Sequence, residues 1–358
     1  MKKIILFLFV LTTLSACHND PISFPDYTFS AVYFPYQYPV RVITLGEDIY
    51  DNTLDLQHKC SIQATLAGVY DNKHDVTIDV AVTDSACTGY SMVNNLINGI
   101  TPPIVTLTPM PHDYYTLASN KIVIKKGQIS GGVEVQLTDK YFSDPKSVTN
   151  SYVIPLLMTK VSGADSILSG KPLNKGAHPR LLFPKLWDVL PKNYVLYAVK
   201  YINPYHAYYL RRGVDIVPNV VGADSTIVRH PSDVTTYDAA TSDVNKWLCY
   251  LTTTALNVTQ FPVVLKDKKR NNYTCNILLT FDSNGSCVVS SSDPATFTAT
   301  GTGKFVSKGE KNSFGNQDRD VLYLDYTINH LVLQRISKSK DTLLVRNRGV
   351  VMEQFSVK

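Results

Sequence analysis

The sequence is poor in charged residues, in tryptophan and in long apolar runs. Only 18% of its 358 residues are charged and two are tryptophan, whereas 44% are hydrophobic. Such a composition excludes general disorder, and the length is ample for a hydrophobic core without disulfide staples. After residue 14, no apolar run is long enough to cross a membrane as a helix. We therefore expect two or three globular domains.

The compact motifs of hydrolases and nucleotide-binding proteins are missing too. No two of the eight histidines are closer than sixteen positions, so none has the i, i+4 spacing of a zinc-binding helix. No Gly-x-Ser-x-Gly elbow occurs. The Gly-Thr-Gly-Lys at 301–304 lacks the earlier glycine and the following Ser or Thr of a phosphate-binding loop, which favours a bulge or turn between strands. We expect no cofactor, no metal site and no catalytic residue, so the chain is predicted not to be an enzyme.

The first residues are predicted to be a targeting signal rather than part of the fold. Residues 1–16 have two early lysines, an apolar run of signal-peptide length and Leu-Ser-Ala directly before Cys17. This pattern resembles a lipobox, with Cys17 lipidated and 17–25 forming a tether; an ordinary signal peptide with an incidental cysteine is the alternative. Several acyl chains, at about 0.8 kcal/mol per buried CH₂, would give stable anchoring. Membrane contact is expected through this anchor only.

Charge and cysteine then carry little functional information. Without the two lysines of the signal peptide, the net charge falls from +5 to +3, and it is scattered. The densest basic cluster, residues 266–270, is typical of a solvated turn, so we expect no nucleic-acid partner. Five further cysteines have no CxxC spacing and are odd in number, so at least one thiol stays free. We interpret most of them as small buried hydrophobic residues: Cys60, Cys87, Cys249, Cys275 and Cys287.

Strand patterns dominate the chain. Residues 76–82 and 133–137 alternate apolar, mostly β-branched residues with mostly polar ones, which is typical of half-buried strands. Turn clusters such as 282–285 separate these runs. The best helix candidate, residues 232–251, is weakened by its threonines. The pattern predicts an all-β chain: an N-terminal Ig-like β-sandwich followed by a second β-sandwich or barrel-like domain.

A Gly- and Pro-rich stretch suggests where the domains divide. It follows a strongly apolar strand and covers residues 161–184. We therefore place a first domain at 26–160, a linker at 161–184, and a second domain at 185–358.

The remaining compositional signal is tyrosine, with 22 residues against 13 phenylalanines. Tyrosines are dense between 187 and 212, next to an Asn-Pro-Tyr-His loop at 203–206. Sugars present apolar C–H faces and hydroxyls, so a site for them needs flat aromatic rings beside hydrogen-bonding groups. The alternative is packing, which the shared strand face of Tyr197 and Tyr201 with two valines favours. The candidate carbohydrate-binding residues are Trp187, Tyr205, Tyr209 and Trp247.

Several stretches together resemble cell-surface lipoproteins of Bacteroidetes-type bacteria, of the kind encoded beside starch-utilisation (Sus) type glycan importers. The resemblance implies glycan capture at the outer surface, possible importer subunits as partners, and an outer-membrane, lipid-anchored location at the cell surface. It carries no catalytic residues. The stretches cover residues 45–58, 111–117, 122–132, 152–156, 200–213, 301–305, 322–326 and 343–355.

The leading hypothesis is a non-catalytic glycan-binding lipoprotein that captures polysaccharide or oligosaccharide for an outer-membrane importer. The first domain would act as a spacer, and the second would carry an open aromatic surface of modest affinity. The alternative is an adhesin-like or assembly protein that makes protein–protein contacts at the cell surface. A glycoside hydrolase or lyase is the third hypothesis.

Overall fold

The computed structural model describes residues 27–94, 104–217, 225–229, 247–267, 269, 271–313 and 315–358. The predicted signal peptide, tether and Cys17 lie outside these residues. The described chain is almost entirely β-structure, which confirms the predicted fold class. Within the same ranges, no helix has the length and apolarity to span a membrane. The short helices are α2 (Thr53–Leu56), α3 (Asp139–Ser143), and the 3₁₀ turns η1 (Asp84–Cys87), η2 (Pro145–Val148) and η3 (Pro184–Leu186).

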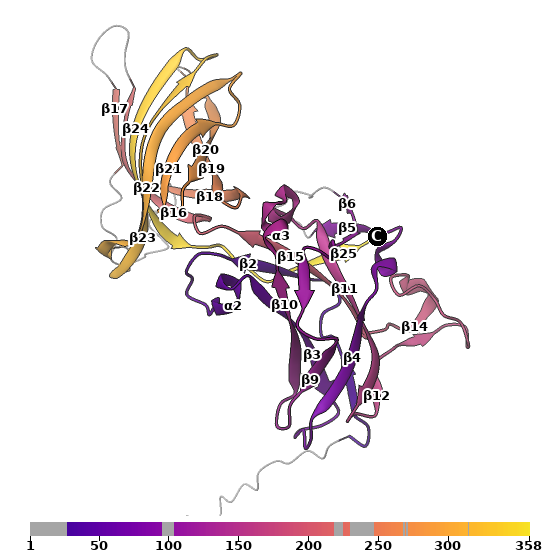
Figure 1. Ribbon diagram of the computed structural model, residues 1–358. Coiled ribbons are helices and arrows are strands. Elements are labelled where there is room, and N and C mark those ends of the chain that lie inside the picture. Colours follow the sequence, from indigo (N-terminus) through magenta and orange to yellow (C-terminus); the bar gives the residue numbers. More distant parts are fainter. Residues whose placement is uncertain are drawn as a thin grey trace, which may run out of the picture.

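Two sheets pack face to face to form a sandwich (Figure 1). The smaller sheet has the order β12 (Ser166–Ile167), β1 (Ala31–Tyr33), β3 (Lys59–Ala67), β10 (Ser130–Leu137), β8 (Tyr115–Leu117). The larger has the order β6 (Ile104–Thr106), β5 (Ser91–Asn94), β25 (Glu353–Val357), β2 (Pro39–Thr44), β15 (Tyr194–Ile202), β11 (Tyr152–Ser162), β4 (Val76–Val82), β9 (Lys121–Ile124), and β7 (Thr108–Pro109) pairs with β11.

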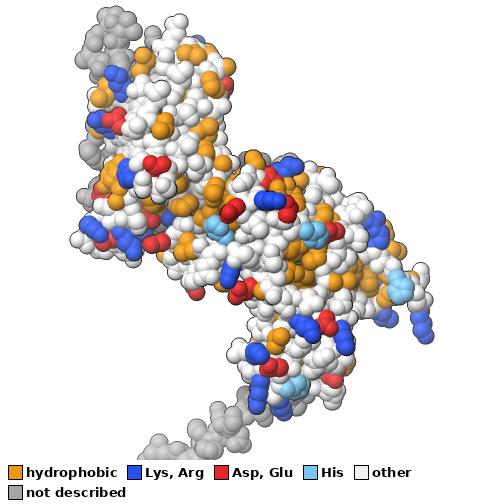
Figure 2. All heavy atoms as spheres, in the orientation of Figure 1, with side chains coloured by type: hydrophobic (Ala, Val, Ile, Leu, Met, Phe, Trp, Pro, Cys, Tyr) orange, Lys and Arg blue, Asp and Glu red, His pale blue; other side chains and the backbone are white. Residues whose placement is uncertain are grey.

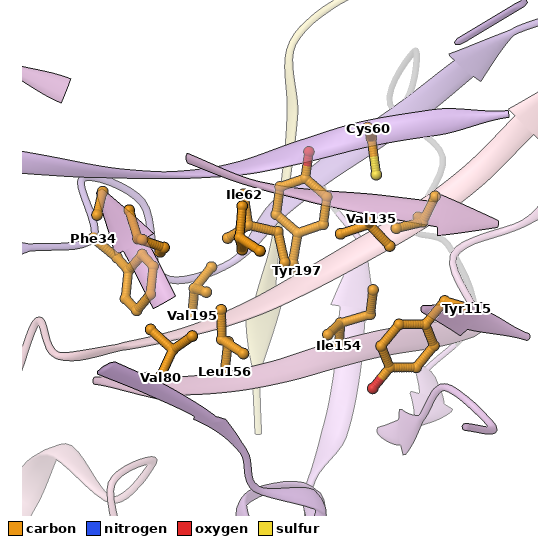
Figure 3. Close-up of a cluster of buried hydrophobic side chains, with 14 of the residues drawn as sticks. Phe34, Cys60, Ile62, Val80, Tyr115, Val135, Ile154, Leu156, Val195 and Tyr197 are labelled. Atoms are coloured by element: carbon orange, nitrogen blue, oxygen red, sulfur yellow. The ribbon is translucent and has the colours of Figure 1, made fainter. Parts of the chain in front are cut away.

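The sandwich core lies between these sheets, as the period-two alternation predicts. In Figure 3, Ile62 and Val135 of the smaller sheet face Ile154 and Leu156 of the larger one. These four side chains are at most 1% exposed. At roughly 1.5–3 kcal/mol for each large apolar side chain removed from water, such a layer accounts for the stability of the sandwich.

Strand β15 is buried on both faces. Val195, Tyr197, Val199 and Tyr201 point into the main core, which confirms that these two tyrosines are packing residues. Leu196 and its even-numbered neighbours join a second core behind the larger sheet, with Phe355 and Met92. A near-continuous apolar run is the expected sequence of such a doubly covered strand.

The position of β15 differs from the predicted domain division. Residues 185–202 were expected in the second domain, yet β15 pairs with β11 and, in parallel, with β2, so it belongs to the sandwich. The ribbon of β13 (Lys171–Pro172) and β14 (Trp187–Val189) projects from the same body. The pairing with β2 joins positions more than 150 residues apart, a relationship that no local pattern reveals.

The second body is a closed barrel. In order, its strands are β16 (Ala207–Val217), β18 (Leu248–Ala255), β19 (Val258–Lys266), β20 (Asn272–Phe281), β21 (Ser286–Ser291), β22 (Phe297–Ser313), β23 (Gln317–His330) and β24 (Arg335–Asn347). Antiparallel pairing of β16 with β24 closes these eight strands into a barrel. Strand β17 (Ser225–Arg229) pairs with β16 and is not one of the eight. Of the two predicted forms, sandwich or barrel, the structure has the barrel. Residues 248–251, the expected end of the helix at 232–251, lie in β18.

The barrel is inserted into the sandwich. The chain leaves β15 at Ile202 to enter the barrel and returns from Asn347 to form β25. Because β15 and β25 both pair with β2, entry and exit lie side by side. Figure 1 shows the barrel and the sandwich at opposite ends of an elongated molecule, with β2 and α2 where they meet.

Candidate functional site

The four predicted aromatic residues do not form one surface. Trp187 lies in the β13–β14 ribbon, half-buried, and its indole Nε1 donates to the carbonyl of Arg180 at 3.1 Å. Trp247 lies on the barrel, where it packs against Leu210 and Leu344. The two tryptophans therefore belong to different bodies.

Tyr209 is wrongly predicted as a sugar-binding residue. Its side chain points into the barrel and has no exposed surface. The phenol hydroxyl donates to the carbonyl of Tyr205 at 2.8 Å. A ring enclosed in this way has no face for a ligand. The neighbouring Tyr208 points outward and stacks on Tyr250, with ring centroids 4.2 Å apart.

Tyr205 lies at the junction of the two bodies and is half-buried. One face of its ring stacks on Phe281, with centroids 3.5 Å apart and planes 10° from parallel. It also lines a hollow of about 280 Å³, the Tyr205 hollow, together with Leu45, Leu56, His58, Pro204, Leu256 and Asn257.

One wall of this junction is residues 45–58, which we call the junction segment. Asn52 holds it in shape, since its Nδ2 donates to the carbonyls of Thr44 at 3.0 Å and Gly46 at 2.6 Å. The carboxylate of Asp55 is 1% exposed, forms an ion pair with Arg41 and accepts the N–H of Thr44 at 2.9 Å. Burial raises the pKa of Asp55, although its two partners act in the opposite direction. These contacts fix the segment against β2.

Arg348 joins the segment to the barrel. Its guanidinium donates to the carbonyl of Glu47 at 3.1 Å, to Pro204, and to His206 at 3.3 Å. It also pairs with Asp320 at 3.5 Å and is 2% exposed. A charged side chain is buried so fully only when its donors are satisfied.

A hollow of about 590 Å³ lies between the junction segment and the strand connection before β25. We call it the Tyr50 cleft, because the ring of Tyr50 is 71% exposed along it. Its lining is Val40, Arg41, Val42, Thr44, Asp48, Tyr50, Asp51, Asn52, Asp55, Val350, Val351 and Met352.

Acidic groups flank the tyrosine in this cleft. Asp51 Oδ1 accepts from the hydroxyl and the N–H of Thr53 at 2.6 and 3.0 Å, which lowers the pKa of Asp51 and keeps it ionised at neutral pH. Asp48 Oδ1 accepts the N–H of Ile49 at 2.7 Å. Among the described residues, neither second carboxylate oxygen has a hydrogen-bond donor, so both are available to a ligand. An exposed ring beside free acceptors can hold a molecule with an apolar face and hydroxyl donors.

Sequence reasoning missed Tyr50. Its signal was the run Asp-Ile-Tyr-Asp-Asn at 48–52, a polar loop with one aromatic residue after a strand. No motif spacing marks such a loop, and only the return of residues 350–352 from the barrel makes it the wall of a cleft.

The other titratable clusters are structural. Among the described residues, no group of three His, Cys, Asp or Glu side chains is placed to hold a metal ion. The five cysteines there are free, and four of them are buried, as predicted for most of them. Burial raises the pKa of Cys60 to about 12, so this thiol is unreactive.

A crystal structure of a Bacteroides ovatus protein of unknown function matches 93% of this chain and 99% of that one, with 43% identity and a TM-score of 0.80. The chain belongs to the same family as this Bacteroides ovatus protein. The predicted likeness to Bacteroidetes proteins is supported to that extent, whereas the lipid anchor and the importer link stay predictions.

Two family models match separate parts of this family member. A domain of unknown function, DUF5627, matches residues 204–349, which are the inserted barrel. A model of an N-terminal domain matches residues 25–165, within the sandwich. No match was found among curated proteins.

More distant structures add no argument about function. A second Bacteroides ovatus protein of unknown function is 16% identical over 92% of this chain and all of that one, with a TM-score of 0.37. A third, from Bacteroides ovatus ATCC 8483, is described as a candidate carbohydrate-binding protein. It is 13% identical over 92% of this chain and 97% of that one, with a TM-score of 0.27.

Proposed function

We propose that this protein is a non-catalytic, glycan-binding lipoprotein of the cell surface, and that the Tyr50 cleft holds the sugar. The observation that carries the proposal is the ring of Tyr50, 71% exposed beside the free carboxylate oxygens of Asp48 and Asp51. An exposed tyrosine ring presents a flat apolar face on which a ligand can pack. A pyranose supplies both an apolar face for the ring and hydroxyl donors for the carboxylates.

We expect the cleft to hold part of a long chain rather than a whole small molecule. It is bounded by the junction segment on one side and by residues 350–352 on the other. Such a site covers part of a few sugar units and leaves the polysaccharide ends free. Affinity per site is therefore expected to be modest.

Two parts of the proposal rest on the sequence alone. Lipidation of Cys17 would place the protein at the outer membrane, and capture for a Sus-type importer would give the bound glycan a destination.

The test is binding of the full mature protein to a panel of soluble starch, yeast mannan, xylan, pectic galactan and chondroitin sulfate. Affinity electrophoresis finds the glycan, and isothermal titration measures the affinity. Tyr50→Ala is expected to weaken binding about tenfold or more, equal to about 1.4 kcal/mol.

Tyr27→Ala is the matched control. Tyr27 is 82% exposed, and its backbone N–H donates to the carbonyl of Gly68 at 3.1 Å. Gly68 follows the far end of β3, about 30 Å from the junction, so this variant is expected to bind as wild type. If the folded wild-type protein binds none of these glycans, the proposal is overturned.

A second candidate function is protein–protein contact at the cell surface. Ile49, Val351 and Met352 are 66–83% exposed near the Tyr50 cleft, and apolar side chains gathered in this way are typical of interaction surfaces. Figure 2 shows hydrophobic side chains at the surface where barrel and sandwich meet. Co-purification of a defined partner from membranes, lost in Met352→Asp and with no glycan binding, would favour this function instead.

A further inference from the structure

The outer wall of the barrel carries a further hollow with a tyrosine in its lining. Three neighbouring strands contribute to it, and register places their outward side chains opposite one another. Lys304 of β22, Tyr323 of β23 and Thr342 of β24 form one row, and Thr302, Asp325 and Lys340 form the next. The hollow is about 450 Å³, and its lining includes these six residues. We call them the Tyr323 platform.

The ring of Tyr323 is held in a fixed direction. Its hydroxyl donates to Glu310 Oε1 at 2.7 Å. Glu310 lies further along β22, beyond an irregularity in the pairing, so the side chain extends along the strands rather than straight outward. The ring stays 37% exposed. A ring that is already immobilised loses little conformational entropy when a ligand covers it.

Lys304 turns away from the tyrosine, which helps to keep the hollow open. Its Nζ donates to the carbonyl of Asn284 at 2.6 Å and to the hydroxyl of Ser286 at 3.2 Å, on the side of β21. Without these bonds the lysine could fold over its cross-strand neighbour Tyr323. The space beside the ring is therefore a built feature of this wall.

Donors and acceptors lie at the edge of the hollow. Asp325 and Lys340 pair at 3.2 Å, with side chains 65% and 80% exposed. An exposed pair of this kind contributes little to stability, so a ligand hydroxyl can bridge or replace it at small cost. Thr302 and Thr342 add hydroxyl groups.

We propose that the Tyr323 platform is a second saccharide-binding site, in which a sugar ring stacks on Tyr323 and its hydroxyls bond to Asp325, Lys340 and the threonines. This inference rests on the proposed glycan-binding function. Two modest sites on one rigid molecule bind a single long polysaccharide more tightly than either site alone, because the second contact is intramolecular.

The experiment uses the full mature protein and whichever glycan of the panel retards it most in affinity electrophoresis. Tyr323→Ala is expected to weaken binding of the polysaccharide about tenfold. Lys340→Ala, which keeps the ring, is expected to weaken it less. The double variant Tyr50→Ala/Tyr323→Ala is expected to lose retardation altogether. Unchanged thermal denaturation shows that the variants are folded.

Tyr208→Ala is the matched control, because Tyr208 is also an outward barrel tyrosine that is 37% exposed. It is expected to migrate as wild type. Suppose that wild type is retarded and that both Tyr323→Ala and Lys340→Ala migrate as wild type does. The proposal of a second site is then overturned, and the proposal for the Tyr50 cleft stands. The same conclusion follows if Tyr208→Ala weakens binding as much as Tyr323→Ala does. If wild type binds no glycan, both proposals fail.

Discussion

Arg348 Nε donates to the carbonyl oxygen of Glu47 at 3.1 Å, across 301 positions of the chain. Gly46, the residue before Glu47, makes room for this contact: a Cβ there would lie 2.7 Å from the guanidinium carbon. The contact between the junction segment and the barrel therefore depends on one buried arginine and on the absence of one methyl group.

Loss of this arginine should destabilise the junction. Arg348→Ala removes the hydrogen bonds to the carbonyls of Glu47, Pro204 and His206 and the ion pair with Asp320. We therefore expect the free energy of unfolding in urea to fall by about 3 kcal/mol. Lys308→Ala is the control, because Lys308 also pairs with Glu47, at 3.7 Å, but both side chains are more than half exposed. A loss of less than 1 kcal/mol is expected there. Equal losses would contradict the assigned role.

Gly46→Ala tests the same contact from the other side. The added methyl group should cost about 1–3 kcal/mol, because neither the guanidinium nor the backbone of Pro204, 3.0 Å away, can move freely. In Arg348→Ala the clash with the guanidinium disappears, whereas the contact with Pro204 stays. The two losses should therefore fall short of additivity in a double-mutant cycle, and simple addition would show that the two residues do not interact.

His206 should make stability depend on pH. Its Nδ1 accepts the N–H of Thr253 at 3.0 Å and its Nε2 lies 2.7 Å from the Tyr250 hydroxyl, so the neutral ring fits the site. Burial, with Arg348 and Lys200 nearby, lowers the pKa of His206 to about 4 from 6.5. The unfolded chain therefore binds a proton first as pH falls.

The sign of the effect follows from this difference. The contribution of His206 is complete above pH 6.5, is lost progressively between pH 6.5 and 4, and totals about 3 kcal/mol. Urea unfolding at several pH values measures it. His206→Gln should flatten the dependence in this window, and parallel curves for the variant and wild type would contradict the assignment.

Loss of a buried ion pair inside the barrel should lower the free energy of unfolding by more than protonation of His206 does. Arg211 donates to Asp341 Oδ2 at 3.0 Å, Tyr326 donates to the same oxygen at 2.8 Å, and the Asp341 side chain has no exposed surface. Asp341→Ala should cost about 3–5 kcal/mol, since Arg211 stays buried without this partner. Arg211→Met/Asp341→Leu should cost less than the single change. A single variant as stable as wild type would show that water reaches the site.

Tyr209 offers a direct test of its burial. Tyr209→Phe should cost about 1 kcal/mol, for the hydrogen bond to Tyr205, and Tyr209→Ala about 3–5 kcal/mol, for the cavity. Glycan binding by Tyr209→Phe should equal that of wild type. Weaker binding with unchanged stability would instead restore Tyr209 as a contact residue.

The sequence predicted local structure well because strand periodicity is a local signal. The strand face that Tyr197 and Tyr201 share with two valines favoured packing, and the structure places both tyrosines in the core. The sheet to which this strand belongs could not be predicted, because the pairing of Ala198 with Val40 is decided by tertiary packing. For that reason the linker prediction at 161–184 ended the first body too early.

The candidate site was harder to predict than the fold. Tyrosine density cannot separate Tyr208 from Tyr209, although one faces solvent and the other the barrel core. The alternation was present, but which face is inward depends on barrel closure between β16 and β24. Tyr50 stood in a stretch noticed only for its family resemblance, without a chemical reason to select it.

The insertion of the barrel also sets an order of synthesis. β2 leaves the ribosome about 300 residues before its partner β25, and every barrel strand is made in between. Local antiparallel pairing can close the barrel early, whereas the larger sheet of the sandwich waits for a strand of very distant sequence position. Until then the apolar residues that Phe355 covers, such as Met92, stay open to water. A complete barrel can therefore form while the sandwich that carries it still lacks β25.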